Sequence, residues 1–280
     1  MEQQQDQTQD EKPNPPPAQA TLHEVRTAEN SAAYLLPKLQ SMKEAKPQLA
    51  LLDVGAGSGT ISVSFAKLIP GGHVTGIDLN PNILPRARAV AEMAGVKNID
   101  FQQGSVYQLP FADETFDVTF CHQVLIHIGN PWDALREMLR VTKRGGVVAA
   151  REGDYESECV WPELPELAKF HKLMAGLMRS GGGTPNAGRQ LLSWALKAGV
   201  EPSQVTLSYS PLSYDTPSRR QTCSRGLCEQ LRGGPMREKA IKFGLATEGD
   251  FEGMTKAWEE WAKRDDASLA MLNGEILVQK

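Results

Sequence analysis

The sequence is short of cysteine, of excess positive charge and of long apolar runs, and each shortage excludes a class of protein. Its four cysteines match no zinc-ligand spacing, so no metal site is predicted. A formal net charge of −4 disfavours nucleic acid as a partner, and no apolar run reaches the roughly 20 residues of a membrane-spanning helix. The amino terminus is too polar for a signal peptide and too acidic for a transit peptide, which predicts a cytoplasmic protein with reduced thiols. Nothing in the sequence indicates an obligate protein partner.

Apolar residues are also missing from the first 20 residues, where Gln, Asp, Glu and Pro dominate. A segment of this composition cannot bury a core, so residues 1–20 are predicted to form a disordered tail. From Thr21 the pattern changes, because apolar residues recur at helical spacing through 21–39 and predict one helix there. Residues 21–280 are predicted to form one domain, which begins with the segment 21–47.

Short apolar strands and helices alternate from residue 48 to residue 153. The pattern predicts strands at 49–55, 73–78, 98–104, 116–122 and 145–153 and helices at 58–69, 81–95 and 131–143. Strands that are apolar throughout and alternate with helices are typical of a parallel sheet covered on both faces. The expected fold class is therefore α/β.

The alternation stops after Asp154. Residues 162–198 have a mostly helical pattern with a break at 181–188, residues 204–210 predict a weak strand, and 211–235 cannot be assigned. Thr247 and Asp250 are spaced as in a capping box at the start of a helix over 247–264, and 268–280 predicts a strand or a hairpin. A helical insertion at 154–235 and a C-terminal helix and strand at 236–280 are therefore expected.

A glycine-rich turn follows the first predicted strand in the stretch 51-LLDVGAGSGT-60. Gly55, Gly57 and Gly59 allow a tight turn and a close approach of the backbone to a ligand. The dinucleotide fingerprint needs G-x-G-x-x-G, and its third glycine would fall on Thr60, which counts against NAD. Asp78 ends the second strand and can accept the ribose hydroxyls of NAD or of S-adenosylmethionine (SAM), so it does not discriminate between them.

The acid before this turn favours SAM. Asp53 lies two positions before the first glycine, where a carboxylate would repel a pyrophosphate and attract the ammonium group of SAM. The alternative is that Asp53 only caps the backbone of the loop, and the two roles are compatible.

Five stretches resemble, in order and spacing, the motifs of class I SAM-dependent methyltransferases, including methyltransferase type 11 and the ubiquinone-biosynthesis enzymes. They are LLDVGAGSGT, GIDLN, GSVYQLPF, FDVTFCHQVLIHI and RVTKRGGVV. The resemblance covers residues 48–153 and implies SAM as cofactor and a Rossmann-like fold. That fold has a mostly parallel seven-stranded sheet with helices on both faces, an N-terminal helical lid over 21–47 and a helical insertion after the fifth strand.

The same resemblance implies which residues hold the cofactor. They are Asp53, Gly55, Ala56, Gly57, Asp78, Leu79, Asn80, Gly104, Ser105, Val106, His122, Gln123 and, from the lid, Arg26. Ser105 departs from the family pattern, because many members carry Asp there. Its hydroxyl can still bond the adenine amine, but the charge-assisted part of that bond is lost.

The rest of the chain resembles one fungal branch of this superfamily, the gliotoxin-type bis-thiomethyltransferases. The resemblance is carried by 23-HEVRTAENSAAYLLPKL-39, by 187-AGRQLLSWALKAG-199, by the tryptophan-rich last helix and by 274-GEILVQK-280. It implies an S-methyltransferase that methylates both thiols of a reduced epidithiodiketopiperazine in successive steps, in secondary metabolism or detoxification.

Thiol methylation needs little or no general base. A thiol pKa of about 8.5 leaves a useful thiolate fraction near neutral pH. His127 is the candidate to contact or deprotonate the substrate, with a structural histidine as the alternative. His122 follows a buried strand and is expected to line the cofactor.

Further substrate contacts are expected beyond the fifth strand. Asp154, Tyr155 and Trp161 follow that strand, at the sheet edge where ligands of doubly wound folds bind, with a solvated loop or a core position as the alternatives. Arg189 is expected to contact the substrate or Asp154, or only to anchor the insertion.

The lid offers two more candidates. Tyr34 and Arg26 fall on one expected helix face with His23 and Asn30. Arg26 either pairs with the SAM carboxylate or forms an ordinary surface salt bridge, and Tyr34 is a candidate substrate contact.

Three other functions stay open from the sequence. They are an O-, N- or C-methyltransferase for another small metabolite, an NAD-dependent oxidoreductase, and a SAM-binding protein without catalysis.

Overall fold

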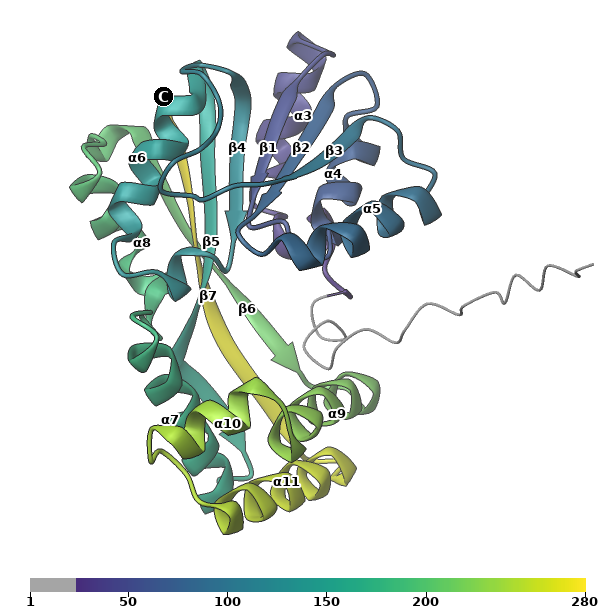
Figure 1. Ribbon diagram of the computed structural model, residues 1–280, viewed down its shortest axis with the longest axis vertical. Helices are drawn as coiled ribbons and strands as arrows, with labels where there is room; N and C mark the ends of the chain where they lie inside the picture. Colours follow the sequence, from purple (N-terminus) through teal and green to yellow (C-terminus); the bar gives the residue numbers. More distant parts are fainter. Residues whose placement is uncertain (1–23) are drawn as a thin grey trace, which may run out of the picture.

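The computed structural model describes residues 24–280, so the predicted tail and His23 lie outside the described residues. An upper part holds most of the sheet with helices on both faces, and a lower group of helices packs at the far end of three long strands (Figure 1). Within 24–280, no helix combines the length and apolar character needed to cross a membrane.

Seven strands form one sheet in the order β3-β2-β1-β4-β5-β7-β6. Their bounds are β1 Ala50–Val54, β2 His73–Asp78, β3 Ile99–Gln103, β4 Phe116–His122, β5 Thr142–Trp161, β6 Val205–Tyr214 and β7 Ser268–Gln279. The strands β1 to β5 pair in parallel, and β7 is antiparallel to both β5 and β6. The predicted Rossmann-like, mostly parallel seven-stranded sheet is thus confirmed.

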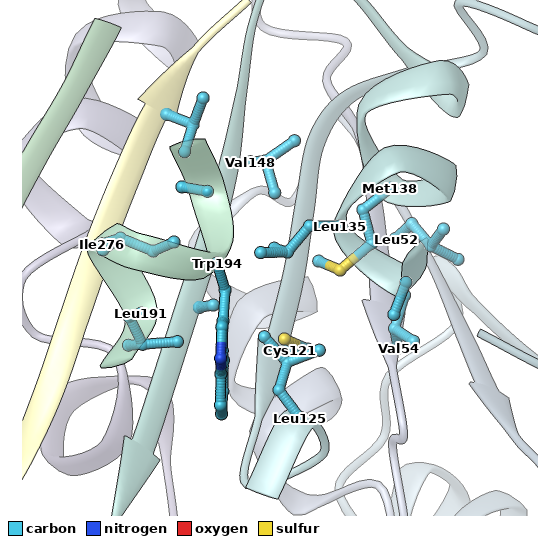
Figure 2. Packing of buried hydrophobic residues seen from close by; sticks show 14 of the residues in the cluster. Leu52, Val54, Cys121, Leu125, Leu135, Met138, Val148, Leu191, Trp194 and Ile276 are labelled. Atoms are coloured by element: carbon cyan, nitrogen blue, oxygen red, sulfur yellow. The ribbon is translucent and has the colours of Figure 1, made fainter. Parts of the chain in front are cut away.

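Apolar side chains alternate between the two faces of this sheet, because successive residues of a strand point in opposite directions. Leu51 and Val147 belong to a buried cluster with the helices α3 (Leu36–Ala45) and α4 (Thr60–Leu68). Their neighbours Leu52 and Val148 belong to a second cluster with α6 (Pro131–Val141) and α8 (Ala187–Lys197). Figure 2 shows this second cluster, in which Trp194 of α8 lies near Cys121 and Leu125. A further helix, α5 (Leu84–Met93), follows the short helix η1 (Pro81–Ile83) and packs on β3.

The N-terminal segment differs from the prediction of one helix over 21–39. A four-residue helix, α2 (Ala28–Ser31), ends before a turn, and α3 starts only at Leu36. Pro37 explains the break: it lacks a backbone N–H and fits the first turn of a helix but not its interior. Arg26 therefore precedes α2, and Tyr34 lies in the turn, so the two do not share a helix face.

The strand β5 continues beyond its predicted end at residue 153, and the lower helices pack at its far end. These are α7 (Pro165–Ser180), α9 (Pro217–Arg232), α10 (Pro235–Lys242) and α11 (Glu248–Lys263). They bury their own cluster around Phe251, Trp258 and Trp261, each fully buried. Thr247 caps α11 in the predicted capping box with Asp250. A short helix, η3 (Pro202–Gln204), precedes β6.

Candidate functional site

The glycine turn at the end of β1 is held against β2 and leaves open space above it. The amides of Gly55 and Ala56 both donate to the carbonyl oxygen of Ile77 at 2.8 Å. Gly55 and Gly57 have positive φ, which a side chain disfavours. A Cβ at Gly55 would lie 2.3 Å from Val124 Cγ2, whereas a Cβ at Gly57 would meet no atom within 4 Å. The backbone at Gly57 therefore faces room for a ligand.

Asp78 at the end of β2 fixes the same turn. Its Oδ2 accepts the amide of Gly57 and its Oδ1 accepts the amide of Asn80, both at 2.9 Å. Each carboxylate oxygen keeps another lone pair, so Asp78 can still accept a ribose hydroxyl. Leu79 beside it is 70% exposed, as an adenine-covering side chain at a cofactor entrance would be before cofactor binds.

The loop after β3 lies next to Asp78. The amide of Gly104 donates to the carbonyl oxygen of Asp78 at 3.0 Å, which joins the ends of β2 and β3. Ser105 follows and accepts the amide of Tyr107 on its hydroxyl oxygen at 3.3 Å. Val106 packs partly buried against the α6 and α8 cluster. The predicted adenine-side residues thus lie on one continuous edge.

Asp53 is buried beneath the turn. Burial raises the pKa of its carboxyl group to about 7, the charge of Asp78 raises it slightly, and a hydrogen bond from the Ser62 hydroxyl lowers it. Near neutral pH this carboxyl group is therefore half protonated, and a cation bound nearby would favour its ionised form.

The loop after β4 is held by a residue that the sequence analysis missed. Glu152 of β5 is fully buried, and its carboxylate accepts the amides of Val124, Leu125 and Ile126 at 2.9 to 3.2 Å. Burial raises the pKa of Glu152 to about 7, although these hydrogen bonds oppose the shift. The bonded amides begin the helix η2 (Leu125–His127), so Glu152 fixes the loop that carries His127.

His127 ends η2 at the solvent-facing side of this loop, and the residue is exposed. Partial enclosure by protein lowers the pKa of its imidazole, and the charge of Arg26 lowers it further. The imidazole is therefore mainly neutral at neutral pH and able to accept a proton.

Gln123 connects this loop to the lid. It is one of two non-glycine residues with positive φ within 24–280, and its amide donates to the carbonyl oxygen of Arg151 at 2.9 Å. Its side-chain oxygen accepts a 2.6 Å hydrogen bond from Arg26. Two residues earlier in the lid, Glu24 binds Arg86 of α5 through two 2.8 Å hydrogen bonds. Residues 24–26 are thus tied to α5 on one side and to the β4 loop on the other.

Arg26 lacks an acidic partner. Burial lowers the pKa of its guanidinium, and no carboxylate of residues 24–280 lies within 4 Å of it. A desolvated cation with one neutral partner fits an anionic group of a ligand, such as the carboxylate of SAM.

A buried polar network lies beside the end of β4. His122 Nε2 lies 3.0 Å from Arg151 Nη1, and Arg151 also binds Glu275 of β7 at 3.1 Å. Burial raises the pKa of the nearby Tyr34 hydroxyl, which has no hydrogen-bond partner in the part of the chain that the structure describes. His122 therefore lies at the predicted cofactor edge but is engaged with Arg151.

The substrate residues predicted to follow the fifth strand lie within β5 and separate into two places. Asp154 is buried and receives two hydrogen bonds from Arg189, at 2.5 and 2.9 Å, which is one of the contacts expected for Arg189. Tyr155 follows at the edge of the upper core. Trp161 ends β5 among the lower helices with its side chain 56% exposed, so the structure does not bring it to the other predicted residues.

The residues at this edge fit SAM. Four groups suited to parts of SAM lie along the ends of β1, β2 and β4. They are the open backbone of Gly57, the carboxylate of Asp78 for ribose, the buried Asp53 for the ammonium, and the Arg26 guanidinium, without an acidic partner among residues 24–280, for the carboxylate. No group of three His, Cys, Asp or Glu side chains among residues 24–280 could hold a metal ion.

Comparisons with known proteins agree with this geometry. The family model of a methyltransferase domain matches residues 45–191. An uncharacterized methyltransferase of Schizosaccharomyces pombe is 32% identical over 274 residues, 93% of each chain. The probable methyltransferase ltbC of Aspergillus luteorubrus is 31% identical over 275 residues, 92% of each chain. The structure of the YcgJ protein from Bacillus subtilis has the same fold, with a TM-score of 0.54 at 20% identity over 88% of this chain and 97% of that one. The chain therefore belongs to the class I SAM-dependent methyltransferases.

Proposed function

We propose that the protein is an S-methyltransferase that methylates both thiols of a small dithiol metabolite, of the reduced epidithiodiketopiperazine type. The observation that carries this proposal is the half-buried guanidinium of Arg26, which has one neutral partner, Gln123, and no carboxylate within 4 Å among residues 24–280, and which therefore fits the carboxylate of SAM. With that carboxylate paired, the sulfonium of SAM would be the positive charge that the nucleophile meets, and it favours an anionic nucleophile. Among common nucleophiles a thiol gives up its proton readily.

SAM supplies, when bound, a methyl group on a positive sulfur, so the substrate thiolate forms a new S–C bond while the methyl–sulfonium bond breaks and S-adenosylhomocysteine is left. The chain's own residues then have three tasks. Gly57 and Asp78 fix the position of the cofactor, Glu152 holds the loop beside it, and Arg26 binds the carboxylate of SAM. The thiol proton leaves to solvent or to His127, whose lowered pKa keeps it ready to accept.

The dithiol and its two successive methylations rest on the resemblance of the lid, α8 and the C-terminal segments to the gliotoxin-type enzymes. The sulfonium charge would also favour a phenolate or an enolate, so an O- or C-methyltransferase is the second candidate. These candidates differ in the nucleophile, and a panel of nucleophiles separates them.

A mass-resolved transfer assay tests the proposal. The protein and SAM are offered a reduced epidithiodiketopiperazine, dithiothreitol and a phenol, with protein lacking SAM as the control. We expect a gain of one and then two methyl groups on the epidithiodiketopiperazine, and slower transfer by Arg26→Gln. Transfer to the phenol alone would leave the methyltransferase assignment intact and contradict the thiol assignment. Binding of SAM without transfer to any nucleophile would contradict both.

A further inference from the structure

A bulge in β5 lies where the upper part of the protein meets the lower helices. Asp154 pairs with Leu272 of β7 and Cys159 pairs with Ala270, so residues 155–158 all lie opposite Met271. Bulges of this kind redirect side chains and occur often beside functional sites. The side chains of residues 155–158 therefore do not alternate between the two faces of the sheet as those of a regular strand do.

Three of the four bulge residues are tied to protein partners. Glu156 binds Arg179 of α7 and accepts the Asn186 side-chain amide at 2.7 Å. The Ser157 hydroxyl oxygen accepts the amide of Leu272 at 2.9 Å. Glu158 lies 3.1 Å from His171 of α7.

The fourth bulge residue, Tyr155, has a fixed backbone and an unused hydroxyl. Its amide donates to the carbonyl oxygen of Pro185 at 2.8 Å. Its hydroxyl has no hydrogen-bond partner within residues 24–280. The bulge is thus fixed at each residue, and the only polar side-chain group it leaves unpaired is this phenol.

A second phenol belongs to the lower part of the protein. Tyr214 ends β6 and packs against the cluster of the lower helices, whereas Tyr155 packs against the cluster of α6 and α8. Its hydroxyl also lacks a hydrogen-bond partner in the described part of the chain. Tyr214 pairs with Leu269 of β7, two residues from Met271, which lies opposite the bulge, so the two tyrosines flank β7 at the junction of the two parts.

We propose that Tyr155 and Tyr214 form the substrate-binding pair, and that their hydroxyls donate hydrogen bonds to two carbonyl oxygens of a small ring held between the two parts. The inference rests on the proposed function and adds the residues that recognise the ring of the substrate. Burial raises the pKa of both phenols, so they are neutral and act as donors. A ring with two carbonyl oxygens satisfies both hydroxyls.

Kinetics on two dithiols test this inference. Tyr155→Phe and Tyr214→Phe remove only the hydroxyls, and Tyr209→Phe, an exposed tyrosine of β6, is the matched control. We expect each test variant to raise the KM for the reduced epidithiodiketopiperazine about tenfold. The Kd of SAM and the KM for dithiothreitol, which has no carbonyl, stay unchanged. Equal effects on the two dithiols, or no effect on either, would overturn the inference.

A binding measurement separates this inference from the proposed function. A cyclic dipeptide without thiols is titrated into the protein saturated with S-adenosylhomocysteine, so no methyl transfer is involved. Weaker binding to both Phe variants than to the wild type and to Tyr209→Phe supports the carbonyl-binding pair even if no thiol is ever methylated. Absent binding, or equal binding to all four proteins, refutes it.

Discussion

Arg26 of the lid segment donates a 2.6 Å hydrogen bond to the side-chain oxygen of Gln123, the first residue after β4. This contact places a half-buried cation, which has no acidic partner among residues 24–280, beside the cofactor edge. Because the segment that carries Arg26 is also tied to α5 through Glu24, the guanidinium keeps its position before any ligand arrives.

Replacing Arg26 tests its contact with the cofactor. We expect Arg26→Gln to raise the Kd of SAM by about tenfold or more, because a charge-assisted hydrogen bond is lost. Calorimetric titration with SAM measures the effect. Arg144→Gln, at a side chain 89% exposed, is the control and should bind SAM normally. A change of less than twofold in Arg26→Gln would show that the guanidinium does not contact the cofactor.

Two glycines of the turn form a matched pair. Gly55→Ala strains a positive φ and drives a Cβ into Val124, so we expect the free energy of unfolding to fall by at least about 2 kcal/mol. Gly57→Ala strains a similar φ but meets no protein atom within 4 Å. Gly57→Ala should therefore weaken SAM binding more than it lowers the free energy of unfolding. Thermal melting and SAM titration of both variants measure the difference, and equal loss of stability would contradict the open space at Gly57.

The pKa of Asp53 predicts a pH dependence of SAM binding. In the free protein this pKa is raised to about 7, so below pH 7 the carboxyl group carries a proton. An ammonium beside it favours the ionised form, and binding then releases that proton. Affinity should therefore fall as the pH falls, and be about tenfold weaker at pH 6 than at pH 7.5.

Glu152 has a similar pKa, so variants must separate the two acids. Asp53→Asn should bind SAM weakly with little pH dependence, whereas Glu152→Gln should keep the pH dependence. If the SAM affinity of Asp53→Asn still fell as the pH falls, the titrating group would be another residue.

Glu152 should position the β4 loop for transfer. Glu152→Gln keeps one good acceptor for three amides, so we expect a lower kcat and a loss of about 2 kcal/mol in the free energy of unfolding. Glu252→Gln, at an exposed glutamate of α11, is the control for the loss of one carboxylate. Initial rates at saturating substrate and thermal melts measure both quantities. A stability loss with kcat unchanged would make Glu152 purely structural.

The upper core could be predicted from the sequence because its strands are short, apolar and separated by helices of ordinary amphipathic pattern. The glycine turn, Asp53 and Asp78 could be found because they occupy fixed places at strand ends. The structure brings Asp53, Gly57, Asp78 and Gln123 to one edge of the sheet, as the motif order implied.

In the lower part the sequence indicated α7, α11 and β7 but not α9, α10 or the far half of β5, because the packing of these elements leaves little apolar pattern. Residues 154–161 of β5 are mostly polar, since they serve ion pairs and a bulge at the junction. In α9 the buried positions include the small residues Ser224 and Gly226, which let the helix approach α11 closely, and the Ser224 hydroxyl donates to the carbonyl oxygen of Trp258. The placement of Trp161 among the lower helices follows from the unforeseen length of β5.

The bulge at 155–158 is the place where the β5–β7 ladder is interrupted between the upper sheet and the lower helices. The β6–β7 ladder passes the same place without a break, from Val205 opposite Val278 to Tyr214 opposite Leu269. One continuous pair of strands therefore connects the upper sheet to the lower helices. The bulge changes the direction of its side chains without loosening this connection, so the spacing between the glycine turn and the lower helices is set by the sheet itself.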